Sequence, residues 1–280
     1  MTFQTLVEGL SFSEGPRWHA GRLYYSDFYR HVVEAVDLNG QVETIAEVAT
    51  QPSGLGWLPD GRLLIVSMLD RKLLRQEADG SLVEHADLSG VATFHCNDMV
   101  VDQVGRAYVG NFGYNIEDQS AKRVWSKLSL VQPDGSVSVV AEDVKFPNGC
   151  VITPDQKTLI VAETWGRCLT AFDIDDAGHL SGRRQWANVD PHFPDGICLD
   201  TEGGVWVADP AQGKVLRVLE GGEISEELTV GAGAFAVKLG GNDGRRLFVC
   251  AADGSGHAAA KTRTSKILTL DVNYTSANSP

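Results

Sequence analysis

Side chains that offer oxygen atoms recur at one position of a repeated sequence unit. The unit starts with a residue that is often polar and often followed by glycine, and it continues through a short Asp-Gly turn into an alternating strand. Its six copies begin at the anchor residues Glu14, Ser53, Asn97, Asn148, Asp195 and Ala234, which are spaced 39, 44, 51, 47 and 39 residues apart. Two anchors are carboxylates and two are carboxamides, so the repeat brings potential metal ligands to one register.

A divalent cation would account for this set of oxygen atoms. Buried carboxylates are costly unless they are paired, and no Lys or Arg occupies an anchor position. We expect one divalent metal ion, calcium first, with magnesium, manganese, zinc and iron(II) as alternatives. The competing interpretation is that the anchors are turn residues, since Asn and Asp before Gly are common in turns. That interpretation explains neither Glu14 nor the shared register.

The elements that must position the anchors are short strands. A period of about 40–50 residues with several strands per unit is typical of a propeller. Asn39-Gly40 and Asp134-Gly135 each separate two alternating runs, which indicates hairpins. We therefore predict an all-β fold: a single domain over residues 1–280, forming a six-bladed β-propeller with four short antiparallel strands per blade. A β-sandwich or two β domains would not repeat the turn motif six times at this period.

Ring geometry explains how anchors distant in sequence could meet. The innermost strand of each propeller blade lines the central channel, so equivalent positions form a ring near one of its mouths. We expect the first strand, residues 3–7, to close the ring by pairing with the last, residues 266–272. Residues 273–280 are expected to form a flexible tail.

Four motifs resemble those of a known family. They are Ser13-Glu14-Gly15-Pro16, Asn97-Asp98, Phe146-Pro147-Asn148-Gly149 and Phe193-Pro194-Asp195-Gly196. In this order, and over nearly the whole chain, they look like the gluconolactonase and regucalcin (senescence-marker-protein) family. The resemblance implies a six-bladed propeller with one catalytic divalent metal in the channel, held by Glu14, Asn148 and Asp195. It also implies that Asn97 is a substrate contact or a further ligand, and that Asp195 doubles as general base.

The expected reaction is hydrolysis of a lactone or related ester of a small molecule. The metal would polarise the carbonyl, and Asp195 would accept a proton as water attacks. One alternative uses the same site for other Lewis-acid chemistry on a carbonyl or phosphotriester compound, namely a lyase, retro-aldol, cyclisation or phosphotriester hydrolysis reaction. Another is a calcium-binding propeller without catalysis. Metal-free propellers of the strictosidine-synthase type are disfavoured because the anchors are intact.

Two histidines lie near the anchors in sequence. Family members that act on sugar lactones typically carry Arg two residues before the Asn-Asp pair, and this chain has His95 there. This difference argues against a polyhydroxylated substrate. His95 is either a substrate hydrogen-bond donor or proton shuttle, or a buried histidine bonded to the backbone. The candidate catalytic residues are thus Asp195, Asn97 and His95, while His192 lies on a loop that enters the same mouth.

Composition limits the partners and the compartment. The formal net charge is −13, which argues against binding to nucleic acid and to anionic membranes. The five cysteines form no CxxC pair, and no signal peptide or membrane span is recognised, so we expect a cytoplasmic protein with reduced thiols. The expected partner is a small-molecule lactone or carbonyl substrate, bound by a monomer or a small homo-oligomer.

Overall fold

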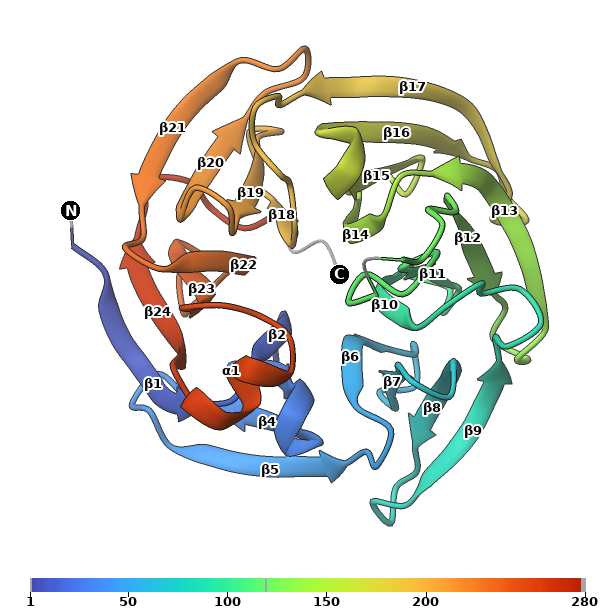
Figure 1. Cartoon of the computed structure of the whole chain (residues 1–280), viewed down its shortest axis with the longest axis horizontal. Coiled ribbons are helices and arrows are strands. Elements are labelled where there is room, and N and C mark those ends of the chain that lie inside the picture. Colours follow the sequence, from blue (N-terminus) through green and yellow to red (C-terminus); the bar gives the residue numbers. More distant parts are fainter. Residues whose placement is uncertain (1, 119, 278–280) are drawn as a thin grey trace.

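Six four-stranded antiparallel sheets surround a central channel, as the predicted propeller requires (Figure 1). The computed structural model describes residues 2–118 and 120–277. In every sheet the strands follow one another outward from the channel, and each sheet forms one blade. This arrangement confirms the six-bladed propeller and excludes the β-sandwich.

Each blade begins with its innermost strand. Blade one contains β2 (Ser13–His19), β3 (Arg22–Asp27), β4 (Val32–Val36) and β5 (Val42–Glu47), and blade two contains β6 (Pro52–Trp57), β7 (Leu63–Ser67), β8 (Lys72–Gln76) and β9 (Leu82–Asp87). Blade three contains β10 (Cys96–Val101), β11 (Ala107–Asn111), β12 (Ser126–Val131) and β13 (Val137–Val144), and blade four contains β14 (Pro147–Ile152), β15 (Thr158–Glu163), β16 (Cys168–Ile174) and β17 (Leu180–Asn188). Blade five contains β18 (Ile197–Leu199), β19 (Val205–Asp209), β20 (Lys214–Val218) and β21 (Ile224–Thr229), and blade six contains β22 (Gly233–Gly240), β23 (Arg246–Ala252), β24 (Ser265–Asp271) and β1 (Gln4–Leu10).

Blade six closes the ring. Its outermost strand is β1, which pairs antiparallel with β24 through partners such as Gln4 with Thr269 and Thr5 with Leu268. The predicted closure between the first and last strands is therefore confirmed, with strand limits that differ by a few residues. The two ends of the propeller are joined by the backbone hydrogen bonds of this pair.

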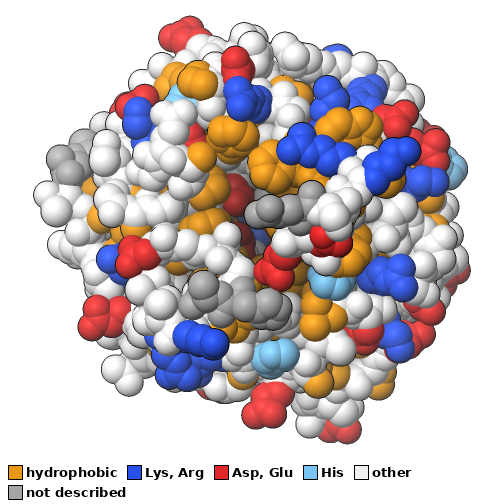
Figure 2. Space-filling view, in the orientation of Figure 1, with side chains coloured by type: hydrophobic (Ala, Val, Ile, Leu, Met, Phe, Trp, Pro, Cys, Tyr) orange, Lys and Arg blue, Asp and Glu red, His pale blue; other side chains and the backbone are white. Residues whose placement is uncertain are grey.

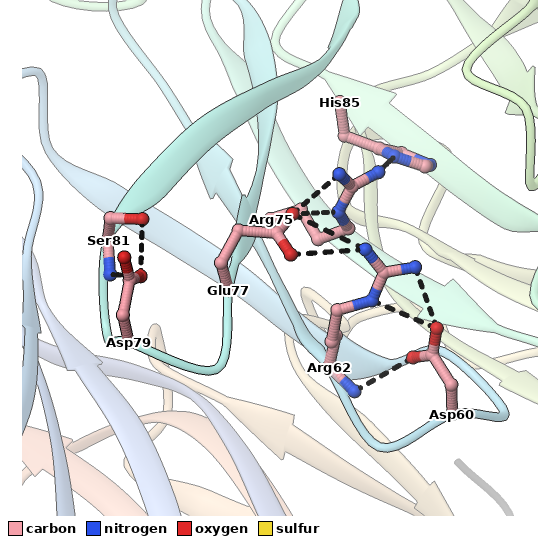
Figure 3. A network of polar contacts seen from close by, with 7 residues as sticks. All are labelled: Asp60, Arg62, Arg75, Glu77, Asp79, Ser81 and His85. Atoms are coloured by element: carbon pink, nitrogen blue, oxygen red, sulfur yellow. Dashed lines mark hydrogen bonds and ion pairs between the residues drawn. The ribbon is translucent and has the colours of Figure 1, made fainter.

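The hairpin turns contain the expected Asp-Gly pairs. In blade two, Asp60 Oδ1 accepts a hydrogen bond from the backbone N–H of Arg62 (3.1 Å), and Asp79 Oδ1 accepts one from that of Ser81 (3.0 Å; Figure 3). Across the blade, Glu77 binds both Arg62 and Arg75, and these contacts link the two hairpins. The aspartates act as local turn caps, which is why these turns were recognisable from sequence.

The core lies within and between the blades. The innermost strands β10 and β14 are buried along their whole length, whereas the outermost strand β5 is mostly exposed. One apolar cluster joins Val151 and Leu169 of blade four to Val205 and Leu216 of blade five. Because the inner strands are held by both neighbouring blades, they form a rigid frame for the side chains that face the channel.

Helical structure is short, as the predicted all-β fold requires. It comprises the 3-10 turns η1 (Phe28–Arg30) and η2 (Thr164–Gly166) and the helix α1 (His257–Thr262). Within the described part of the chain, no helix has the length and apolar character needed to cross a membrane.

The end of the chain was expected to be a tail from residue 273 onward. Residues 273–277 are instead held against the blades, since Thr201 N–H donates to Thr275 O (2.9 Å) and Ser276 N–H donates to Gly244 O (2.8 Å). Residues 278–280 lie outside the described residues.

Candidate functional site

The four oxygen-bearing anchors meet at one cavity in the channel. Glu14 lies on β2, Asn97 on β10 and Asn148 on β14, while Asp195 lies two residues before β18. All four line a cavity of about 760 Å³. The other two anchors, Ser53 on β6 and Ala234 on β22, are not among the described residues that line it. Side chains from blades one, three, four and five thus converge at the same place.

A β-bulge accompanies the anchor on several innermost strands. On β2 the pairing moves from Glu14 opposite Ser26 to Arg17 opposite Tyr24, which leaves one extra residue on β2. The same one-residue shift occurs on β10 between Cys96 and Met99 and on β14 between Pro147 and Cys150. Bulges redirect side chains and are common beside active sites. The anchors are therefore residues of irregular inner strands rather than of turns.

The glycine after the anchor permits neighbouring inner strands to approach closely. A Cβ on Gly54 would lie 2.5 Å from the backbone nitrogen of Met99, and one on Gly196 would lie 2.5 Å from Cβ of Ala236. Gly196 N–H also donates to Phe235 O at 2.8 Å. Since a real side chain cannot occupy these positions without displacing the next blade, the repeated anchor-Gly pair has a packing cause.

Hydrogen bonds orient the two carboxamides. Asn97 Nδ2 donates to Asn148 Oδ1 (3.1 Å), and Asn148 Nδ2 donates to Thr164 Oγ1 (3.3 Å). Thr164 Oγ1 in turn donates to Pro194 O (2.8 Å), in the segment that leads into Asp195. These hydrogen bonds determine which end of the Asn148 amide is the oxygen. They leave that oxygen a second lone pair for a ligand.

Of the two carboxyl anchors, Asp195 is buried and Glu14 is half-buried, and their negative charges are unfavourable together. Burial raises the pKa of Glu14 to about 8, even though the Gly15 N–H donates to its Oε2 at 3.0 Å. Burial also raises the pKa of Asp195 well above its usual value, and the charges of Glu14 and Asp98 add to this shift. Asp195 Oδ1 is buried and has no hydrogen-bond partner among the described residues. A cation bound here would satisfy that oxygen and offset the repulsion, so this donor set fits a hard metal ion.

A buried arginine below the anchors was not recognised from sequence. Arg17 Nη2 donates to Asp98 Oδ1 (2.8 Å) and to the backbone oxygen of Met99 (2.5 Å). Lys238 on β22 is also buried nearby, and burial together with the Arg17 charge lowers its pKa to about 8. In a regular strand, Arg17 and Glu14 would point to opposite faces, and the bulge between them changes that relationship. The only sequence signal was the position of Arg17 in the strand. Without knowledge of the bulge, that position does not show which face the side chain occupies.

His95 and His192 occupy different environments. His95 lines the cavity and stacks on Phe94 with ring centroids 3.9 Å apart. Burial lowers its pKa, so the imidazole is neutral at pH 7. His192 is buried, with Nδ1 2.7 Å from Asp209 Oδ2, and is not among the described lining residues. His95 is thus the histidine placed to contact a bound molecule.

Two aromatic side chains near the anchors also differ in their surroundings. Phe112 lines the cavity, whereas Trp165 is not among its described lining residues and packs against Phe146.

Among the residues that the structure describes, no group of three or more His, Cys, Asp or Glu side chains could hold a metal. The candidate set contains only two carboxylates and relies on carboxamides, and its ligand role stays a prediction.

Comparison with known proteins identifies the family. The model of the SMP-30/Gluconolactonase/LRE-like region matches residues 12–253. The chain belongs to this family. A family relative, a pentonolactonase of Haloferax volcanii, is 28% identical over 274 residues, covering 93% of this chain and 88% of the relative. Membership confirms the resemblance drawn from the four anchor motifs.

Solved structures share the fold of the family. A calcium-binding protein, regucalcin, from Agrobacterium tumefaciens has a TM-score of 0.81 and 20% identity, covering 98% of this chain and 95% of that one. A gluconolactonase from Xanthomonas campestris has a TM-score of 0.78 and 24% identity, covering 96% and 89%. At these identities the likeness concerns the fold. The Haloferax relative is named as a lactonase, which agrees with the enzyme class expected from the four motifs.

Proposed function

We propose that this protein hydrolyses a lactone, or a related ester, of a small molecule at a divalent-metal site in the propeller channel. Glu14, Asn148 and Asp195 would hold the ion, with Asn97 as a further ligand or substrate contact. Membership of a family that includes proteins named as lactonases supports the reaction class. Calcium is the first candidate ion because all the donors are oxygen atoms.

We also propose a cytoplasmic location, supported by five cysteines that are all unpaired.

The observation that carries the proposal is a pair of carboxyl groups on one cavity, of which Asp195 is buried and Glu14 half-buried. Burial raises the pKa of both Glu14 and Asp195, and the charge of Glu14 adds to the shift at Asp195. Asp195 Oδ1 lacks a hydrogen-bond donor among the described residues. Arg17 does not satisfy this oxygen, because its guanidinium donates to Asp98, Met99 and Pro16. A structural role alone does not explain why such a pair is retained, whereas a cation site at the base of a substrate cavity does.

The residues of the site have distinct tasks in hydrolysis. A bound divalent ion supplies Lewis-acid polarisation of the substrate carbonyl. Asp195 would bind the ion through one carboxylate oxygen, and its carboxylate would accept the proton of the attacking water and pass it to the leaving ring oxygen. Asn97 and Asn148 orient each other through their 3.1 Å hydrogen bond. His95, neutral and facing the cavity, can give or receive a hydrogen bond at the leaving oxygen.

A chelation experiment tests this function. Purified protein is treated with EDTA and dialysed, then assayed for lactone hydrolysis with calcium, magnesium, manganese or zinc added back. We expect chelation to abolish turnover and at least one ion to restore it. Asp195→Asn should lower kcat by about 10²–10⁴-fold with an unchanged circular dichroism spectrum. Full activity after verified metal removal, or in Asp195→Asn, would refute the assignment.

A further inference from the structure

The cavity above the anchors has a polar floor and an aromatic wall. Six phenylalanines line it within the described part of the chain: Phe12, Phe28, Phe94, Phe112, Phe146 and Phe235. Tyr29, Met68 and Ile116 add further apolar surface. Figure 2 shows this face of the ring, with hydrophobic side chains gathered around the central hollow. A volume of about 760 Å³ lies within the range of small-molecule sites.

The rings are packed against one another in a fixed arrangement. The ring of Phe12 lies 4.8 Å from that of Phe235, edge to face, and 5.4 Å from that of Phe28. Phe112 and Phe146, from blades three and four, stack with centroids 5.0 Å apart. Contacts of this kind reduce the freedom of the rings before a ligand arrives. The wall is therefore a preformed apolar surface.

Charge in the cavity is of one sign. No Lys or Arg is among the described lining residues, while Glu14, Asp195 and Glu117 are. Beyond the floor, the polar lining residues Asn115, Glu117 and Ser255 are exposed to solvent, whereas Gln51, Tyr29 and His95 are buried or half-buried among the phenylalanines. A substrate hydroxyl held against the phenylalanine rings would lose water without gaining a partner, and an anionic group there would find no Lys or Arg among the described lining residues.

We propose that the substrate is an uncharged lactone whose body is hydrocarbon, with an aromatic ring fused to the lactone as the best fit. This inference rests on the proposed hydrolysis and specifies its substrate class. The carbonyl end lies at the anchors, and the aromatic body lies among Phe12, Phe112 and their neighbours. Polyhydroxylated and anionic lactones are poor substrates, in contrast to what the name of the pentonolactonase relative indicates for that protein.

Kinetic selectivity is the first test. The metal-loaded protein is assayed with dihydrocoumarin, δ-valerolactone, D-glucono-δ-lactone and D-xylono-γ-lactone. We expect kcat/KM for dihydrocoumarin to exceed that for either sugar lactone by at least 100-fold, with δ-valerolactone between them. Equal or better turnover of a sugar lactone would overturn the substrate class while leaving the proposed hydrolysis intact.

Binding to metal-free protein separates the two proposals. Two lactams that resist hydrolysis, 3,4-dihydro-2-quinolone and D-glucono-δ-lactam, are titrated into chelated protein by calorimetry. We expect the quinolone to bind at least 30-fold more tightly. If no lactone is hydrolysed with any metal but this preference is found, the proposed function fails and the apolar specificity stands. Equal binding of the two lactams would overturn the specificity whatever the activity.

Variants locate the binding surface. Phe112→Ala should weaken quinolone binding five- to tenfold, and Phe112→Leu, which keeps the wall apolar, should weaken it less. Phe3→Ala is the matched control, because Phe3 packs against a core cluster of blades five and six and is not among the described lining residues. If Phe3→Ala and Phe112→Ala weaken binding equally, the proposed wall is wrong. If the Phe112→Ala protein does not fold, the same comparison is made between Phe112→Leu and Phe3→Leu.

Discussion

The guanidinium of Arg17 on β2 and the carboxylate of Asp98 on β10 form a buried ion pair at 2.8 Å. Their strands are the innermost strands of blades one and three, which are not adjacent in the ring. The pair therefore links two blades that are not neighbours, and Arg17 lines a second cavity rather than the one with the phenylalanines.

Removal of one partner of this pair should be costly. Arg17→Met should lower the free energy of unfolding by about 3–5 kcal/mol, because Asp98 would be left buried and charged. Denaturant unfolding measures the change. The control is Arg22→Met, whose more exposed partner Glu43 makes a surface pair expected to contribute at most about 1 kcal/mol. Equal effects of the two substitutions would mean that the buried pair has no special structural role.

Metal-free protein should become less stable as the pH rises. The pKa of Glu14 is about 8 in the folded protein and 4.5 in its unperturbed state, so the folded form retains a proton that the unfolded chain releases. The stabilising contribution of this proton is present below pH 4.5 and is lost as the pH rises through 8, an effect of a few kcal/mol.

Thermal melts in EDTA between pH 5 and pH 8.5 measure this loss. Glu14→Gln should flatten the pH dependence, and a saturating divalent ion should restore stability at high pH. The prediction fails if, in EDTA, the melting temperatures of the wild-type protein and of Glu14→Gln change by the same amount between pH 5 and pH 8.5.

Close approach of the inner strands predicts a glycine effect. Gly196→Ala would place a methyl group 2.5 Å from Cβ of Ala236, and we expect a loss of about 1–3 kcal/mol in unfolding free energy. Gly90→Ala is the control, since a Cβ there meets no atom within 4 Å. Chemical denaturation of both variants measures the difference, and a tolerated Gly196→Ala would show that blades five and six can separate locally.

Thr164 should act as a positioning residue for the metal site. It accepts a hydrogen bond from Asn148 Nδ2 and donates one to Pro194 O, so Thr164→Val leaves the Asn148 amide free to rotate. We expect a 10–100-fold loss of divalent-ion affinity by calorimetry with a small change in melting temperature. Thr153→Val is the control, because it makes the same substitution on an exposed turn away from the site. An unchanged affinity in Thr164→Val would show that this hydrogen bond does not position the ligand.

The blades and their closure were predictable because each repeat contains its own signals. Asp60 and Asp79 cap turns within their hairpins, and the anchors Glu14, Asn97 and Asn148 recur at one register, so local patterns were sufficient. The convergence of the anchors on one cavity followed from ring symmetry alone.

The remaining parts of the site depend on irregular features. The contact between Arg17 and Asp98 requires bulges on β2 and β10, and a bulge changes the face of a side chain without leaving a clear sequence pattern. Phe28, Phe94 and Phe235 reach the cavity from loops and strand ends of different blades, which follow no common period. The aromatic wall therefore became visible only in three dimensions.

The pairing of β1 with β24 has a consequence for biosynthesis. Because the ribosome releases the N-terminal strand first and β24 almost last, β1 must wait unpaired while nearly the entire polypeptide is made. During that interval an exposed edge is available to other nascent chains. Blades three to five could already be assembled, yet Glu14, next to the open seam, would gain its final surroundings only when the circle is completed.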